Sequence, residues 1–359
     1  MVHDGDPYYS GFEKHGIQNA MKASVYNESR QIELQDIPCP EIGAGELLMK
    51  VHACGVCGTD VQKIQFATAT PPLVLGHEVA GTVEKVGAQV QGFSVGERIV
   101  VAHHTPCYAC HYCLHGNVSM CKTFKSSNLD PGGYAEFLRI PAAHVQMTTH
   151  KVPHHVSFEE AIYMEPLACV LRNIKRAQLQ YADVVLIIGL GSVGLLTAMA
   201  CKALGMRVIG SDLKKERRDL AVRCGIDAVC DGDPMHVREQ VQSLSQNLGA
   251  DLVVLTAGNE KVYTNSIDYV RNGGKINIFA GLSPESKLQF PVNEIFKREI
   301  TVYSSYSPSP IELLEAINMI AQSKVQVSNI QNQLYDLPDL SQAIADVVET
   351  KVMKAIIRP

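Results

Sequence analysis

The segment DVVLIIGLGSVG, residues 183–194, joins an apolar β-branched run to a glycine-rich turn. In a strand–turn–helix unit, glycines spaced G-x-G-x-x-G permit a tight turn, close approach of the backbone to a pyrophosphate, and close packing of the helix. The phosphates then lie over the N-terminus of the helix. The segment therefore predicts a dinucleotide site. The residues expected to bind the cofactor are Gly189, Gly191, Ser192, Val193 and Gly194.

Apolar runs alternate with helical stretches over the rest of this region. The runs DVVLIIG, MRVIGSD, DLVVLTAG and GGKINIFAG are separated by stretches such as SVGLLTAMACKALG. This alternation predicts an α/β fold with a doubly wound parallel sheet, which we assign to residues 169–305. Thr256 and Ala280 end two of the strands, at the sheet edge where ligands bind, so we expect both in the cofactor site. Ordinary loop residues fit these two positions nearly as well.

Asp212 ends the strand that follows the glycine turn. A carboxylate there can accept hydrogen bonds from the ribose hydroxyls of NAD and would repel the 2′-phosphate of NADP. Four basic residues follow, and they could either bind that phosphate or form a solvated helix face. We favour NAD. The basic residues are Lys214, Lys215, Arg217 and Arg218.

The N-terminal half of the chain has a different pattern. Between residues 21 and 141, short β-branched runs such as MKASVY and VAGTVEKVG are separated by Gly and Pro turns, which is typical of a small irregular barrel. The helical pattern PIELLEAINMIAQSKV and the strand-like VMKAIIRP suggest that the last fifty residues return to this first domain. We therefore expect one domain at residues 21–168 and 306–359, and an N-terminal extension at residues 1–20 of unknown role.

Composition places the chain among ordinary globular proteins. Hydrophobic residues make up 46% and charged residues 19%, and the formal charge of −5 disfavours nucleic acid or an anionic membrane as partner. A small-molecule substrate fits better. The first residues lack a secretory signal and the longest apolar run is too short to span a bilayer, so we expect a cytoplasmic protein without a membrane anchor.

Four of the eleven cysteines are clustered in TPCYACHYCLHGNVSMC, residues 105–121. Their spacing C-x2-C-x2-C-x7-C suits a closed tetrahedral zinc site with a structural role. An iron–sulfur centre is the rival, but bacterial ferredoxins continue with x3-C-P where seven residues intervene here. The expected structural-zinc ligands are Cys107, Cys110, Cys113 and Cys121.

A second set of metal-binding residue types is scattered along the chain. Cys57 lies in GVCGTD, His77 and Glu78 lie in LGHEVAG, and Glu165 lies in YMEPLA. Each alone is more often a packing residue. Together they offer the mixture of sulfur, nitrogen and oxygen ligands that zinc accepts when it keeps an open position.

The order of these motifs resembles the zinc-containing medium-chain alcohol dehydrogenase superfamily, in particular its polyol (sorbitol or iditol) and threonine dehydrogenase branch. The resemblance runs from Met21 to Pro359. It implies a GroES-like barrel as the catalytic domain, a Rossmann domain for NAD, two zinc ions per chain, and hydride transfer from a secondary alcohol to the nicotinamide. It also suggests a homodimer or a homotetramer.

The resemblance further assigns roles to individual residues. Cys57, His77 and Glu165 would hold a catalytic zinc, with Glu78 as an alternating or water-mediated ligand. Thr59 would pass the substrate proton outward, and Asp60 would orient His77. One departure is Gln62, where many relatives have a relay histidine; a glutamine does not titrate, so the proton would leave through water or the ribose hydroxyls. His103 and His104 are possible substitutes, although packing roles fit them better.

Two other functions remain open from the sequence. One is oxidation of an amino alcohol, as in threonine 3-dehydrogenase, because the identity of the substrate pocket is not readable from the motifs. The other is a non-catalytic zinc- or nucleotide-binding protein that kept the fold. The complete set Cys57, Thr59, His77 and Glu165 argues against the second.

Overall fold

The computed structural model describes residues 20–359, so residues 1–19 of the expected N-terminal extension lie outside the described part. The chain forms two compact units. The β-rich unit contains the chain up to Glu165 together with Gln331–Pro359, and the parallel-sheet unit contains Pro166–Ile330. From the sequence we placed the domain borders after residue 168 and before residue 306; limited proteolysis of the folded chain would decide between these limits.

The parallel-sheet unit is built on one six-stranded sheet in the order β11-β10-β9-β12-β13-β14. Every neighbouring pair in it is parallel. In chain order this is 3-2-1-4-5-6, the doubly wound arrangement in which the strand order reverses between β9 and β12. The strands are β9 (Val184–Ile188), β10 (Arg207–Ser211), β11 (Ala228–Cys230), β12 (Ala250–Leu255), β13 (Val270–Ile278) and β14 (Thr301–Ser304).

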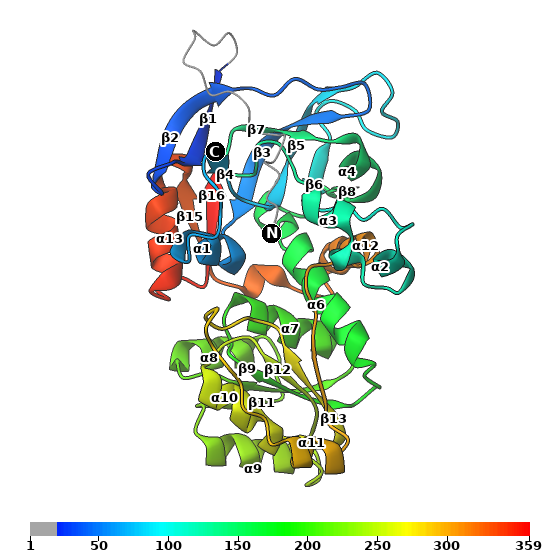
Figure 1. Ribbon diagram of the computed structural model, residues 1–359, viewed down its shortest axis with the longest axis vertical. Helices are drawn as coiled ribbons and strands as arrows, with labels where there is room; N and C mark the ends of the chain where they lie inside the picture. The colour runs from blue at the N-terminus through cyan, green and yellow to red at the C-terminus, as the bar shows by residue number, and fades with distance from the viewer. Residues whose placement is uncertain (1–19) are drawn as a thin grey trace. The chain divides into compact units, whose positions relative to one another are not determined.

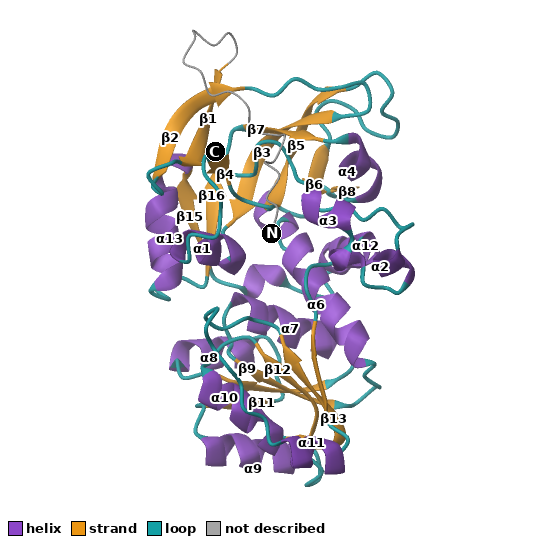
Figure 2. Ribbon diagram, viewed as in Figure 1, coloured by secondary structure: helices purple, strands orange, loops and turns teal. Residues whose placement is uncertain are grey.

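Helices lie on both faces of this sheet (Figure 2). The central strands are therefore buried on both sides, which explains why β9 is an uninterrupted apolar run and does not alternate. The helices of the unit are α6 (Met164–Ala177, which begins in the β-rich unit), α7 (Ser192–Ala203), α8 (Lys215–Arg223), α9 (Pro234–Leu244), α10 (Glu260–Asn265), α11 (Val292–Lys297) and α12 (Pro310–Ala321).

The β-rich unit contains a seven-stranded sheet in the order β15-β16-β3-β5-β6-β8, with β7 paired to β3, and a three-stranded sheet β2-β1-β4. Alternate residues of β3 and β5, such as Met49 and Val79, are buried in one core. The strands are β1 (Ala20–Tyr26), β2 (Ile32–Pro38), β3 (Leu47–Gly55), β4 (Leu73–Val74), β5 (Glu78–Val86), β6 (Arg98–Val101), β7 (Phe137–Ile140), β8 (Thr149–Lys151), β15 (Asn332–Asp336) and β16 (Lys354–Arg358).

The chain enters the β-rich unit again at Gln331. Strand β16 pairs with β15 in parallel and with β3 in antiparallel orientation, so the red strand β16 and the blue strand β3 belong to one sheet (Figure 1). The helices of this unit are α1 (Gly58–Gln65), α2 (His111–Leu114), α3 (Lys122–Ser126), α4 (Ala142–Met147), α5 (Phe158–Ala161) and α13 (Leu340–Val348).

The fold class predicted from the sequence is confirmed: a doubly wound parallel sheet with helices on both faces, and a second, β-rich unit. Within residues 20–359, none of the helices combines the length and the apolar character needed to cross a membrane.

Candidate active site

Antiparallel pairing of β3 and β5 brings together residues that lie about twenty positions apart. Gly55, the last residue of β3, is opposite Glu78, the first residue of β5. Cys57 follows Gly55 by two residues and His77 directly precedes Glu78, so all three side chains reach the same end of the strand pair. The ligand atoms of Cys57, His77 and Glu78 lie within 4.8 Å of one another.

Cys57 is also the N-cap residue of helix α1. Its Sγ accepts a hydrogen bond from the backbone N–H of Thr59 at 3.5 Å, so the first turn of the helix fixes the position of the sulfur. Thr59, the expected proton-relay residue, thus lies two residues after Cys57, the expected ligand, and it is exposed. Gln62 lies in the same helix and is exposed as well.

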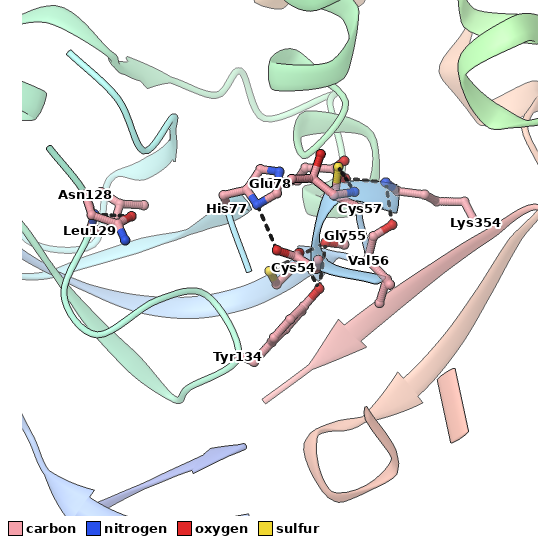
Figure 3. A network of polar contacts seen from close by, with 12 residues as sticks. Cys54, Gly55, Val56, Cys57, His77, Glu78, Asn128, Leu129, Tyr134 and Lys354 are labelled. Atoms are coloured by element: carbon pink, nitrogen blue, oxygen red, sulfur yellow. Dashed lines mark hydrogen bonds and ion pairs between the residues drawn. The ribbon is translucent and has the colours of Figure 1, made fainter. Parts of the chain in front are cut away.

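His77 is held by a buried carboxylate. Oδ1 of Asp60, which is completely buried, lies 3.3 Å from Nδ1 of His77, and Oδ2 of Asp60 accepts a hydrogen bond from Tyr134 Oη at 3.0 Å. Figure 3 labels His77, Glu78, Cys57 and Tyr134 in this group. Burial raises the pKa of the Asp60 carboxyl, but His77 outweighs this effect and the pKa lies below its usual value. Nε2 of His77 is therefore left for a metal ion, in the arrangement typical of carboxylate–histidine–metal sites.

The same group of residues favours a cation. Burial lowers the pKa of His77, but Asp60 and Cys57 raise it more, so that it lies well above its ordinary value. An environment that stabilises an extra proton between a thiolate and a carboxylate also stabilises a dication there. The residues present thus fit zinc, which binds sulfur, nitrogen and oxygen ligands.

Glu165, in the first turn of α6, is buried with 6% of its surface exposed. It is not among the three residues whose ligand atoms lie within 4.8 Å of one another. Its negative charge, however, is one of the causes that raise the pKa of Lys354, whose ammonium pairs with Glu78. Glu165 therefore lies near the group. Cys54, which we do not expect to bind the metal, is completely buried and is not one of these three residues.

His103 and His104 form part of a column of aromatic rings. The ring centroid of His103 lies 4.4 Å from that of His77 and 3.8 Å from that of His104, and His104 lies 4.8 Å from Phe124. Nδ1 of His104 is 2.6 Å from the carbonyl oxygen of Ser127. Burial lowers the pKa of His104 to about 4 and places that of His103 well below its ordinary value. These features favour packing roles over proton relay.

The four clustered cysteines converge on one point. Their Sγ atoms lie within 4.8 Å of one another, with Cys110 and Cys113 at 3.6 Å and Cys107 and Cys121 at 3.5 Å. All are free thiols. Backbone N–H groups of Cys107 and Phe124 outweigh the effect of burial and lower the pKa of Cys121 to about 6, whereas burial raises that of Cys113 to about 12. A dication would allow all four to ionise, so this group fits a structural zinc.

The glycine-rich turn has the geometry expected of a pyrophosphate site. Gly189 has a φ of +97°, which favours glycine, and Gly191 is the N-cap residue of α7. A Cβ on Gly194 would lie 1.8 Å from the carbonyl oxygen of Gly189, so only glycine permits this approach of helix and strand. Ser192 and Val193 begin α7, with their N–H groups at the end of the helix that binds anions.

Two of the other expected cofactor residues hold this turn in place. Thr256 donates a hydrogen bond to the carbonyl oxygen of Gly189 at 2.7 Å, and Oδ2 of Asp212 accepts one from the N–H of Leu190 at 2.7 Å. Arg217 lies 3.4 Å from the same Asp212 oxygen. Ala280 follows β13, and its carbonyl oxygen accepts a hydrogen bond from Tyr263 Oη at 2.9 Å.

Comparisons with known proteins agree with this reading. Residues 43–153 match the family described as alcohol dehydrogenase GroES-like domain, and residues 192–322 match the family described as zinc-binding dehydrogenase. A zinc-type alcohol dehydrogenase-like protein of Escherichia coli, YdjJ, is 30% identical over 90% of this chain and 94% of its own length. The chain belongs to the zinc-containing alcohol dehydrogenase family. The family resemblance seen in the sequence is thus confirmed.

Two further relatives of this family were found. A sorbitol dehydrogenase of Bacillus subtilis is 28% identical over 96% of this chain and 99% of its own length. The structure of a Sinorhizobium meliloti protein assigned as a zinc-binding dehydrogenase and bound to NADP has a TM-score of 0.85 with 27% identity, covering 95% of this chain and 100% of that one. The chain is therefore an oxidoreductase of alcohols, and zinc and a nicotinamide dinucleotide are the cofactors, as the sequence indicated.

Several residues of the site were missed by reasoning from the sequence. No recognised motif contains these residues, which are Tyr134, Lys354 and Tyr263. Each of them contacts a residue that the sequence did predict: Asp60, Glu78 and Ala280 respectively. Tyr134 directly follows the glycine pair of DPGGYAEF, so a buried tyrosine next to an unusual turn was the one available signal.

Proposed function

We propose that this chain oxidises a polyol-type secondary alcohol with NAD, using a zinc ion held by Cys57, His77 and Glu165, with Glu78 as an alternating ligand. The observation that carries the proposal is the convergence of Cys57, His77 and Glu78 within 4.8 Å at the end of the β3–β5 pair. Three ligand types with a carboxylate behind the histidine suit an open zinc site. When bound, zinc would supply a Lewis acid that makes the substrate hydroxyl acidic enough to ionise near neutral pH.

The residues of the chain have distinct tasks in this proposal. Asp60 keeps Nδ1 of His77 oriented, which leaves Nε2 for the metal. Thr59, exposed beside Cys57, accepts the hydroxyl proton of the substrate and passes it to water. When bound, the nicotinamide dinucleotide would supply the acceptor for the hydride that the substrate loses, so that the alcohol would become a ketone and NAD would become NADH. The glycine turn, Asp212, Thr256 and Ala280 would position the dinucleotide.

Polyols are favoured over other alcohols by the Bacillus subtilis relative, a sorbitol dehydrogenase that is similar over nearly the whole chain. The sequence YMEPLA around Glu165 also fits the polyol members slightly better than the threonine dehydrogenases. The test is a panel of sorbitol, other polyols, inositols and threonine, each assayed with NAD. Turnover of one or more polyols is expected, and turnover of threonine alone would refute the assignment in favour of an amino-alcohol dehydrogenase.

NAD rather than NADP is proposed because the Asp212 carboxylate lies at the turn, where it would repel a 2′-phosphate. The neighbouring Arg217 pairs with Asp212 and is thereby less available to a phosphate. Comparison of kcat/KM for the two cofactors tests this choice. A preference for NADP would contradict it.

The cellular setting is proposed from the same reasoning. We expect a cytoplasmic protein with a small-molecule substrate, which assembles as a homodimer or a homotetramer like the family it resembles. Light scattering of the purified protein would give the oligomeric state, and a monomer would refute this part of the proposal.

A further inference from the structure

A column of four aromatic rings joins the two groups of metal-binding residues. Successive ring centroids in it are 4.4, 3.8 and 4.8 Å apart. We call it the ring column, and its members in order are His77, His103, His104 and Phe124. His77 is a proposed ligand of the catalytic metal, and Phe124 packs in one small core with Cys113 and Cys121. The ring column therefore runs from the proposed catalytic site to the four-cysteine site.

Two contacts of the His104 side chain come from helix α3, which directly follows the last of the four cysteines. The His104 ring packs against Phe124 in this helix, and its Nδ1 lies 2.6 Å from the carbonyl oxygen of Ser127, the C-cap residue. Cys121 is the N-cap residue of the same helix. The place of His104 therefore depends on where Cys121 holds the start of α3.

The core around the cysteines is too small to hold α3 without a metal ion. It is separate from the large core of the β-rich unit, and its buried members are Cys113, Val118, Cys121 and Phe124. Small segments that are built around a structural zinc are ordered with the metal and disordered without it, because metal binding supplies the free energy of folding. The four-cysteine segment is thus an element with two states, and the metal selects between them.

His103 is the link between His104 and His77, and its ring is held by packing. Its Nδ1 is buried and has no hydrogen-bond partner among the described residues. Its carbonyl oxygen lies 3.0 Å from Nε2 of His144, a contact that fixes the main chain and leaves the ring free to turn. Contacts with the rings on either side therefore orient the His103 side chain.

We propose that His103 and His104 are positioning residues that couple the two metal sites. Zinc at the four cysteines fixes α3, α3 fixes the ring column, and the ring column keeps His77 in place for the catalytic metal. Asp60 holds Nδ1 of His77 at one edge, whereas His103 packs against the ring itself. The inference rests on the proposed function and on the fit of the four cysteines to zinc. Loss of metal from the cysteines should therefore weaken metal binding at the catalytic site.

The first test is the variant His104→Ala, with the affinity for the catalytic zinc as readout. Competition with a chelator gives this affinity, and the zinc that is missing from Cys57→Ser identifies the catalytic metal in the titration. His104→Ala removes one ring of the column and none of the proposed ligands. The affinity should fall by at least about fivefold, which is the lower end of the usual coupling between two sites. The four cysteines should keep their zinc.

Two further variants separate the ring contact from other effects. His104→Phe keeps a ring in the column and loses the contact of Nδ1 with Ser127, so it should restore most of the affinity. His150→Ala is the matched control, because it removes a partly buried histidine of β8 that is not part of the ring column. It should leave the affinity unchanged. Unchanged affinity in His104→Ala, or equal losses in His104→Ala and His104→Phe, would overturn the inference.

A double-mutant cycle tests the coupling itself. Cys113→Ser removes one ligand of the four-cysteine site and should lower the affinity for the catalytic zinc by at least about fivefold. The same change should have a smaller effect in a chain that already carries His104→Ala, because the path is then broken. Equal effects in the two backgrounds would refute the ring column as the path. If Cys113→Ser folds poorly, His104→Ala and His104→Phe decide, since both keep every proposed ligand.

Failure of the proposed function is distinguishable from failure of this inference. If the unmodified protein and Cys57→Ser bind the same amount of zinc, the catalytic metal site itself is wrong and both proposals fall. If Cys57→Ser loses one zinc while His104→Ala binds the catalytic zinc as tightly as the unmodified protein, only the role of the ring column is refuted.

Discussion

The Asp60 carboxylate lies 3.3 Å behind His77, and Tyr134 donates a hydrogen bond to its other oxygen. This pair accounts for the orientation of the histidine ring without any metal. The carboxylate is completely buried, so its charge is unscreened by solvent and acts mainly on His77.

Asp60→Asn tests this relationship. The amide keeps the size of the side chain but loses the charge, so His77 becomes a weaker ligand. The affinity for the catalytic zinc should fall by about 10- to 100-fold, measured by competition with a chelator. Tyr134→Phe is the matched control: it removes only the hydrogen bond to the far oxygen, and a smaller loss is expected. Unchanged affinity in Asp60→Asn would refute the role of the carboxylate.

Cys113→Ser tests the structural-zinc site. Cys113 and Cys121 are buried with Val118 and Phe124 in a small core of their own, which the zinc would hold together. The variant should lose one zinc per chain, and its melting temperature should fall by at least about 5 °C. Cys224→Ser, outside both metal groups, should retain the full zinc content. Equal stability of the two variants would argue against a structural metal.

Local motifs explain which parts of this site could be predicted from the sequence. The four cysteines lie within fifteen residues and the three glycines within six, so their spacing alone fixes the geometry. The ion pair of Lys354 with Glu78 joins residues 276 positions apart. It depends on the register of β16 against β3, which no single stretch of sequence encodes. The doubly wound sheet was predictable for the same reason as the glycine turn, because apolar strands and helices alternate along the chain.

Asp212→Asn tests the choice of cofactor. The carboxylate accepts backbone hydrogen bonds from Leu190 and Lys214, and an amide oxygen can replace only part of these contacts. Removal of the charge also removes the repulsion of a 2′-phosphate. The ratio of kcat/KM for NAD to that for NADP should fall by at least about tenfold, equivalent to about 1.4 kcal/mol. An unchanged ratio would mean that Asp212 does not select the cofactor.

The pKa of His150, in β8, should make the free energy of unfolding depend on pH. Burial lowers its pKa from 6.5 to about 4, and its Nε2 has no hydrogen-bond partner among the described residues. The unfolded chain binds a proton near pH 6.5 whereas the folded chain does not until about pH 4, so the free energy of unfolding should fall as the pH is lowered through this interval. The contribution is on the order of 1–3 kcal/mol.

His150→Gln removes this titration and should flatten the slope between these pH values in urea unfolding experiments. Part of the slope should remain in that variant, because burial also lowers the pKa values of His103, His104 and His144. If the free energy of unfolding depends on pH in the same way in the variant and in the unmodified protein, burial does not lower the pKa of His150.

The zinc content of the unmodified protein and of Cys57→Ser is the most direct test of a second, catalytic metal site. Elemental analysis should find about two zinc ions per chain in the unmodified protein and about one in the variant, with the four-cysteine site still filled. One zinc per chain in both proteins would contradict the account, because Cys57 and His77 would then bind no zinc.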